Sequence, residues 1–215
     1  MIRLYNYFRS SASYRVRIAL NLKGLAYDYQ SVHLSRGGGE QFSTLFRELN
    51  ALTLVPVLED GEHRITQSLA IIEYLDELHP RPPLLPSNPA ERARVRALAL
   101  SVACEIHPLN NLRVLNYLNQ ELGVESEAKM RWYQHWVAVG LGALEAEIAR
   151  GPRGRFCHGD TPGLADCYLV PQLFNARRFD CDLSPYPKLL AIEEHCMALA
   201  SFRDAAPDSQ PDAER

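Results

Sequence analysis

The chain contains 215 residues, and its 26 acidic side chains slightly outnumber its 23 lysines and arginines, so its formal net charge is −3. This balance argues against a nucleic-acid-binding surface, and no apolar run reaches the ~18 residues that a membrane span requires. The polar start of the chain does not resemble a signal peptide, and its five cysteines, which include no C-x-x-C pair, are typical of reduced thiols. We therefore expect a cytoplasmic protein with no nucleic-acid or membrane partner.

The first part of the chain is predicted to alternate between strands and helices. In chain order we expect a strand at 2–7, a helix at 13–23, a strand at 27–34, a helix at 41–49, strands at 54–60 and 63–66, and a helix at 69–78. Gly24 stands where a glycine commonly ends a helix, and Asp60-Gly61 is a hairpin signal. A βαβ unit followed by a hairpin and a helix predicts a small α/β sandwich.

Serines gather where the first strand gives way to the first helix. Ser10, Ser11 and Ser13 are all candidates to cap that helix. The same helix start offers unpaired N–H groups and a partial positive charge, which stabilise a phosphate, a carboxylate or a thiolate. Helix capping and anion binding are both open interpretations of these serines.

Two further segments of this half suit a peptide-like ligand. Pro56 removes a hydrogen-bond donor at a strand entry, and a cis bond there would turn the backbone sharply. Either way, the Val55 backbone is left to pair with an extended ligand. Gln67 and Ser68 open the next helix, where Ser68 is either a simple N-cap or part of a second anion site.

A proline-rich linker at 81–90 separates the predicted first domain, residues 1–80, from a second domain at 91–215. The expected helices of the second domain lie at 91–122 with a kink at Pro108, 125–150, 163–178 and 187–202. The tail from Ala205 is predicted to fray. The histidines show no metal-ligand spacing, so no metal site is expected.

Four segments of the chain, FRSSASYRVRIAL, QSLAIIEYL, GDTPGLADCYLVPQ and ARRFDCDLSPYP, resemble those of the zeta class of glutathione transferases. The resemblance implies a thioredoxin-like N-terminal domain followed by an all-helical C-terminal domain. It also implies glutathione as cofactor and a homodimer. The implied activity is glutathione-dependent cis–trans isomerisation of maleylacetoacetate to fumarylacetoacetate in aromatic amino acid catabolism. Bacterial relatives isomerise maleylpyruvate instead, and the motifs are shared between the two activities.

The chain departs from the class signature at one position, where Ala12 replaces a cysteine. No protein thiol is therefore available there, and the sulfur must come from glutathione. Addition of a thiolate to the cis alkene, rotation and expulsion would give the trans product. A free thiol has a pKa of about 8.5, so the site must favour the thiolate, and we expect the Ser10 hydroxyl to face the sulfur.

The resemblance also implies roles for individual residues. The expected catalytic groups are Ser10, Arg9, Arg178 and His107, with the two arginines forming a clamp for a small dicarboxylate substrate. His107 is interpreted as an acid, a base, a hydrogen-bond donor or a structural residue at the helix kink. The expected glutathione-binding residues are Ser10, Ser11, Gln41, Val55, Gln67, Ser68, His107, Asn111 and Arg113.

Two other function classes are compatible with this fold. A general glutathione transferase would conjugate electrophiles with the same thiolate, but paired arginines do not suit greasy substrates. A non-catalytic interaction module would keep the fold without needing Ser10, Gln67, Ser68 and Arg178. A thiol–disulfide oxidoreductase is excluded, because the α/β part contains no cysteine.

Overall fold

The computed structural model describes residues 1–214, which form two compact units. The first unit consists of residues 1–84 together with the segment from Met197 onward, and the second of Leu85–Cys196. We describe each unit by itself.

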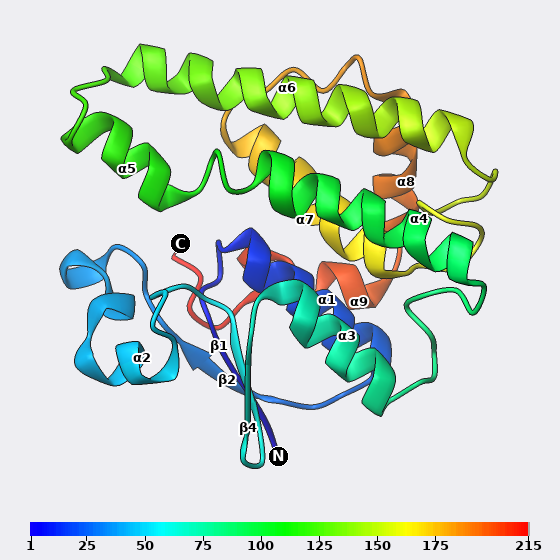
Figure 1. Cartoon of the computed structure of the whole chain (residues 1–215), viewed down its shortest axis with the longest axis horizontal. Coiled ribbons are helices and arrows are strands. Elements are labelled where there is room, and N and C mark those ends of the chain that lie inside the picture. Colours follow the sequence, from blue (N-terminus) through cyan, green and yellow to red (C-terminus); the bar gives the residue numbers. More distant parts are fainter. Residues whose placement is uncertain (215) are drawn as a thin grey trace. The chain divides into compact units, whose positions relative to one another are not determined.

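The first unit is built on a four-stranded mixed sheet with the order β2-β1-β3-β4 (Figure 1). Its strands are β1 (Ile2–Asn6), β2 (Asp28–Ser31), β3 (Val57–Asp60) and β4 (His63–Thr66). β1 runs parallel to β2 and antiparallel to β3, and β3 pairs antiparallel with β4 through the predicted Asp-Gly hairpin. The expected βαβ unit and hairpin are therefore confirmed.

Helices α1 (Ser11–Lys23) and α3 (Ser68–Leu78) pack against each other in this unit. Gly24 ends α1 in the left-handed conformation, with φ of 65°. The helix expected at 41–49 is divided into a 3-10 turn η2 (Glu40–Phe42) and α2 (Thr44–Leu49). The reason is that the Ser43 hydroxyl caps α2 by accepting from the Phe46 amide at 3.3 Å. A further 3-10 turn, η1 (Arg36–Gly38), lies in the glycine-rich loop.

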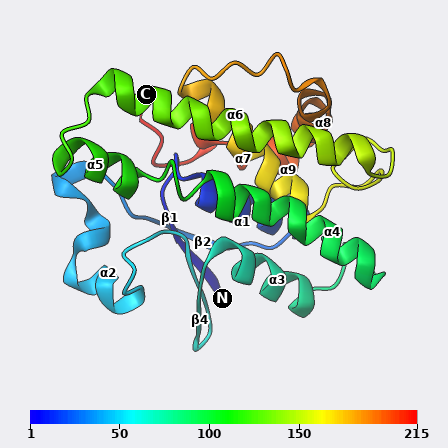
Figure 2. The same cartoon turned by 45° about the horizontal axis from the view of Figure 1, so that its top comes forward.

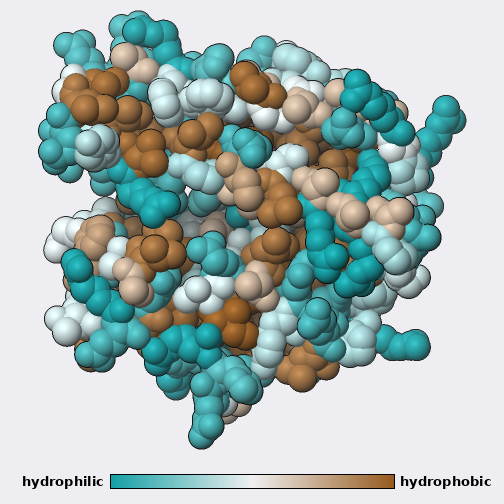
Figure 3. All heavy atoms as spheres, in the orientation of Figure 1, coloured by the Kyte–Doolittle hydropathy of each residue, from teal (hydrophilic) through white to brown (hydrophobic). Residues whose placement is uncertain are grey.

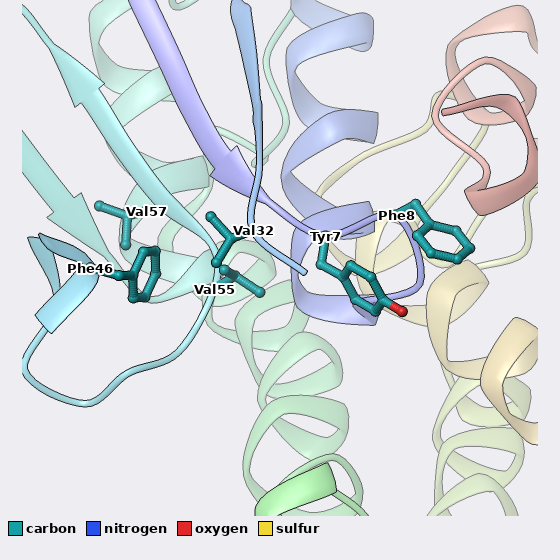
Figure 4. Packing of buried hydrophobic residues seen from close by; sticks show 6 residues of the cluster. All are labelled: Tyr7, Phe8, Val32, Phe46, Val55 and Val57. Atoms are coloured by element: carbon teal, nitrogen blue, oxygen red, sulfur yellow. The ribbon is translucent and has the colours of Figure 1, made fainter. Parts of the chain in front are cut away.

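A buried apolar cluster fixes the ends of β1 and β3. It comprises Tyr7, Phe8, Val32, Phe46, Val55 and Val57 (Figure 4). The cluster joins the backbone on either side of two predicted ligand-binding segments, because Tyr7 and Phe8 directly precede Arg9, and Val55 precedes Pro56. Burying each apolar side chain of this kind stabilises the folded state by about 1.5–3 kcal/mol.

The segment from Met197 to Glu214 packs onto the first unit, although the sequence analysis assigned it to the helical domain. It contains α9 (Ala200–Arg203), which packs on α1, and the 3-10 turn η4 (Pro207–Ser209). The expected fraying beyond Ala205 is wrong, since Ala205 is buried and the Asp212 carboxylate binds Ser31 Oγ at 2.8 Å and the Phe8 amide at 3.3 Å. Composition alone cannot reveal these contacts, which join distant parts of the chain.

The Arg17 guanidinium connects this segment to the core of the first unit. It is fully buried, and it donates to Asn6 Oδ1 (2.9 Å), Tyr7 O (3.3 Å), Phe8 O (2.8 Å) and Ala205 O (3.0 Å). All four acceptors are uncharged. Desolvation therefore lowers the pKa of Arg17, and the hydrogen bonds have to offset the cost of burying the charge.

The second unit is helical. It contains α4 (Pro89–Leu100), the π-helical turn η3 (Ser101–Ile106), α5 (Leu112–Gln120), α6 (Ser126–Arg150), α7 (Leu164–Arg178) and most of α8 (Pro187–Met197). Helix α7 is the central helix, with 11 of its 15 residues buried. Its start is held by Asp166, which accepts from the Gly163 amide at 2.8 Å and the Cys157 amide at 2.9 Å.

The single kinked helix expected at 91–122 is wrong. Irregular backbone separates η3 from α5, and Figures 1 and 2 show α4 and α5 as distinct segments. Pro108 has no N–H to continue the helix, and the preceding turn is widened, with the His107 amide donating to Val102 O at 2.9 Å. Asn111 then caps the new helix.

The surface mixes apolar and polar groups. On the face drawn in Figure 3, hydrophobic side chains are interrupted by hydrophilic ones. Across residues 1–214, no helix combines the length and the apolar composition needed to cross a membrane.

Replacing Arg17 with methionine is expected to lower the free energy of unfolding by about 3–5 kcal/mol, because the change leaves buried acceptors without donors. Urea unfolding followed by circular dichroism measures this. The control is Arg47→Met, since the Arg47 side chain is exposed and donates to Phe42 O from the surface. Equal effects of the two changes would contradict the role given to Arg17.

Candidate functional site

The junction between β1 and α1 forms the first part of the candidate site. Ser10 is the N-cap residue of α1, and its Oγ accepts from the Ser13 amide at 3.2 Å. Ser11 is buried in the first turn. A hydroxyl that accepts a hydrogen bond still has its own proton to donate. Ser10 can therefore cap the helix and donate to an anion in the same geometry.

The start of α3 forms a second part. Gln67 has a positive φ of 69°, a conformation that costs a side-chain-bearing residue of order 1–3 kcal/mol and that clusters at ligand sites. Ser68 follows it, is buried, and accepts a hydrogen bond from Arg15 Nη1 at 3.3 Å. Because Arg15 is itself buried, it places positive charge beneath the N-terminus of α3.

The segments around Val55 and Gln41 present hydrogen-bonding groups without partners. The Val55–Pro56 peptide is cis, and the Val55 amide and carbonyl bond to nothing within residues 1–214. Gln41 is buried, with its Nε2 donating to Leu34 O at 3.3 Å, while its Oε1 is buried with no partner in the described chain. A buried acceptor left open in this way suits an N–H group of a peptide-like ligand.

Arg9 stands directly before Ser10 and is already engaged. Its guanidinium donates to Tyr7 Oη at 2.8 Å and to Glu214 Oε2 at 3.2 Å, and it lies 4.9 Å from the centre of the Phe8 ring. The other oxygen of the Glu214 carboxylate is 2.8 Å from His33 Nε2. The hydrogen bond to His33, more than the nearby arginines, holds the pKa of Glu214 below its usual value.

In the second unit, the break before α5 brings three of the predicted residues together. Asn111 Nδ2 lies 3.4 Å from His107 Nε2, and Asn111 Oδ1 accepts from the Arg113 amide at 3.1 Å. The Arg113 side chain is exposed. The His107 imidazole therefore lies where η3 ends and the irregular backbone begins. Its Nε2 is paired with the Asn111 side chain of the same unit.

Arg177 and Arg178 end α7 and differ sharply in their surroundings. Arg177 forms a two-pronged ion pair with Glu193, which raises the pKa of Arg177. The Arg177 guanidinium is therefore engaged within the second unit. Arg178 is exposed, with its guanidinium 5.1 Å from the centre of the Phe179 ring.

Sequence reasoning missed three residues that shape the first unit's site: Arg15, Arg17 and Glu214. The two arginines stand in α1 beside apolar residues, where a charged side chain usually indicates a solvated face. Glu214 is separated from Arg9 by 205 positions. For Arg15 and Arg17, the one available signal is that two arginines occur among apolar residues within a single helix. No group of His, Cys, Asp and Glu within residues 1–214 is arranged to hold a metal ion.

Comparison with known proteins identifies the family. Residues 4–83 match the family model for the glutathione S-transferase N-terminal domain, and residues 139–194 match the C-terminal domain. The chain is 55% identical to a probable maleylacetoacetate isomerase of Vibrio cholerae, over 98% of this chain and 97% of that protein. It is 50% identical, with a TM-score of 0.95, to a holo structure of a maleylpyruvate isomerase described as a bacterial zeta-class glutathione S-transferase, covering 99% and 100% of the two chains.

The chain belongs to the zeta class of the glutathione S-transferase family.

A further relative has been solved with ligands bound. The maleylacetoacetate isomerase of Anaeromyxobacter dehalogenans, 48% identical with a TM-score of 0.88, covers 100% of this chain and 98% of its own. Its crystal structure holds dicarboxyethyl glutathione and citrate in the active site. The expected two-part fold, a thioredoxin-like unit followed by a helical one, is confirmed by both domain matches.

The first unit of this zeta-class chain contains no thiol that could replace the cysteine missing at Ala12, because all five cysteines belong to the second unit. Burial raises the pKa of Cys157 and Cys196, and it raises the pKa of Cys181 to about 11. Cys104 is exposed, but it lies in η3 of the second unit. The first unit therefore supplies no thiol of its own.

In the folded protein near pH 8, an aromatic disulfide reagent is expected to label one cysteine quickly. Cys104 should react first, because the raised pKa of Cys181 keeps it a thiol until pH approaches about 11. Raising the pH toward that value should speed the reaction of Cys181. The Cys104→Ser variant is the control and should lose the fast phase; rapid labelling of three or more thiols in the wild type would contradict the burial described.

Proposed function

We propose that this chain is a glutathione-dependent cis–trans isomerase that acts on maleylacetoacetate. The observation that carries the proposal is the anion-favouring start of α1, with Arg9, Ser10 and Ser11 in sequence, in a chain 55% identical to a protein named as such an isomerase. Glutathione is the proposed cofactor, in line with the ligands of the relatives.

The residues of the first unit fit glutathione. The Val55 amide and carbonyl, which have no partner within residues 1–214, suit the cysteinyl backbone, and the start of α3 at Gln67 and Ser68 suits the γ-glutamyl carboxylate. The open Oε1 of Gln41 suits an amide toward the glycyl end. Ser10 and Ser11 would then lie at the sulfur.

When bound, glutathione supplies the thiolate that adds to the cis double bond and leaves after rotation. The chain favours the ionised sulfur in two ways. The N-terminus of α1 contributes a partial positive charge, and the Ser10 hydroxyl donates a hydrogen bond to the anion. Arg9, the residue before Ser10, adds positive charge at the same turn.

The proposed substrate carries two carboxylates, and two arginines are proposed to bind them. Arg9 belongs to the turn that leads into α1, and Arg178 is an exposed arginine at the end of α7, next to Arg177, which forms an ion pair with Glu193. Arginine binds carboxylates through parallel hydrogen bonds and stays charged. His107 is proposed to hold or move a proton or to bind glutathione, with Asn111 and Arg113 beside it.

Maleylpyruvate is the second candidate substrate. The structural relative with a TM-score of 0.95 is named maleylpyruvate isomerase, and both substrates are cis enones with two acidic groups. We also propose a cytoplasmic homodimer in aromatic compound catabolism, in which His107, Asn111 and Arg113 reach glutathione, in line with the family resemblance. A chain that elutes as a monomer would remove any role for these residues across the dimer.

The function is tested by an ultraviolet assay of each substrate with and without glutathione. The proposal requires turnover that depends on glutathione and does not consume it. The ratio of the two rates identifies the substrate. Steady loss of glutathione would indicate a conjugating transferase instead, and a folded protein that binds glutathione without turning over either substrate would indicate an interaction module.

Replacing Arg9 or Arg178 with alanine is expected to lower kcat/KM about ten- to a hundredfold, since each change removes hydrogen bonds to a substrate carboxylate worth about 1.5–3 kcal/mol. Glutathione affinity, measured by calorimetry, should change little for Arg178→Ala. The matched control is Arg131→Ala, which removes an exposed arginine that pairs with Glu127 one helical turn away. Unchanged turnover in both variants would refute the clamp.

A further inference from the structure

Three basic side chains of the first unit converge on the carboxylate of Glu214. Arg9 Nη2 is 3.2 Å from Oε2, His33 Nε2 is 2.8 Å from Oε1, and Arg36 Nη2 is 3.9 Å from Oε1. Each comes from a different place in the chain: the turn before α1, the segment after β2, and η1. Such a convergence is how a protein binds a carboxylate from solution.

Two side chains of this cluster, Arg9 and His33, are held in place by contacts on the side away from Glu214. Tyr7 Oη accepts two hydrogen bonds from Arg9, at 2.8 and 3.2 Å, which fixes the plane of the guanidinium. The His33 imidazole is buried, and its Nδ1 accepts from the Arg36 amide at 2.8 Å, so Nε2 is directed toward Glu214. The anion-binding groups therefore have a fixed arrangement whatever carboxylate they meet.

Glu214 reaches the cluster because the segment before it is anchored. Asp212 bonds to the Tyr29 hydroxyl, Ser31 Oγ and the Phe8 amide. The Glu214 side chain itself is 46% exposed and Arg9 is 35% exposed, so their ion pair faces solvent and is weak. An anchored backbone combined with a weakly held carboxylate allows the side chain to leave without unfolding the segment.

We infer that Glu214 is an internal competitor for a carboxylate-binding site formed by Arg9 and His33, which an incoming dicarboxylate must displace. The inference takes from the proposed function only that Arg9 receives a ligand carboxylate. Glu214 then weakens the binding of dicarboxylates and leaves the chemical step untouched. It sets how tightly this site holds small anions.

The first test measures malonate binding by calorimetry on the full chain saturated with glutathione. Glu214→Gln keeps the size of the side chain and removes its charge, and it should tighten malonate binding about two- to fivefold, the range expected when an exposed ion pair is lost. Glu127→Gln removes a carboxylate from another exposed ion pair, with Arg131, and should change nothing. Unchanged or weaker malonate binding in Glu214→Gln overturns the inference, because weaker binding would mean that Glu214 positions Arg9.

A second test places the effect at Arg9. In an Arg9→Gln background, Glu214→Gln should alter malonate binding less than it does in the wild type, since one of the two shared partners is gone while His33 remains; an undiminished effect would overturn the inference. Where the chain isomerises a dicarboxylic enone, Glu214→Gln should lower KM about two- to fivefold at constant kcat. Malonate binding needs no turnover, so tighter binding without isomerisation would refute the proposed function and keep this inference.

Discussion

The site of the first unit depends on the buried guanidinium of Arg17. It donates to the carbonyls of Tyr7 and Phe8, and the Tyr7 carbonyl also accepts from the Ser10 amide at 3.0 Å. The position of the Ser10 hydroxyl is therefore coupled to a cation two helical turns further along α1. The same guanidinium binds Ala205 O, so one side chain connects the end of β1, the ligand-binding turn and the segment that follows Met197.

Positive charge is concentrated locally in a protein whose net charge is −3. Arg15 supports the start of α3 through Ser68, Arg9 stands at the start of α1, and the two helix termini add partial positive charge. These groups all favour anions, and they are fixed before a ligand arrives. A preorganised site of this kind stabilises developing negative charge without the cost of reorienting its dipoles.

Much of the fold could be predicted from local signals. Hydrophobic periodicity gave α6 and α7 nearly to the residue, and Gly24, the Asp60-Gly61 turn and Pro56 marked the expected breaks. The prediction failed where a local rule was too weak. Pro108 within a helical pattern predicts a kink, but the chain there leaves the helix until Asn111 can cap a new one.

The site could be predicted only in part. The serines and the Val55 and Gln67 segments carry local signatures, because caps, prolines and helix starts are properties of neighbouring residues. Arg15, Arg17 and Glu214 act through tertiary contacts, and a charged residue inside an amphipathic helix gives no sign of whether it is buried. The prediction that the polar tail beyond Ala205 frays is wrong for the same reason, since the tail is ordered by contacts with residues near the start of the chain.

The most direct test of this account is a titration of glutathione bound to the protein, followed by the ultraviolet absorbance of the thiolate. The account predicts that the bound thiol ionises at lower pH than free glutathione. Ser10→Ala should raise the pKa of the bound thiol, because the change removes one hydrogen bond to a charged group, worth about 1.5–3 kcal/mol. Ser11→Ala should have a smaller effect. An identical titration curve in Ser10→Ala and the wild type, with glutathione still bound, would contradict the account.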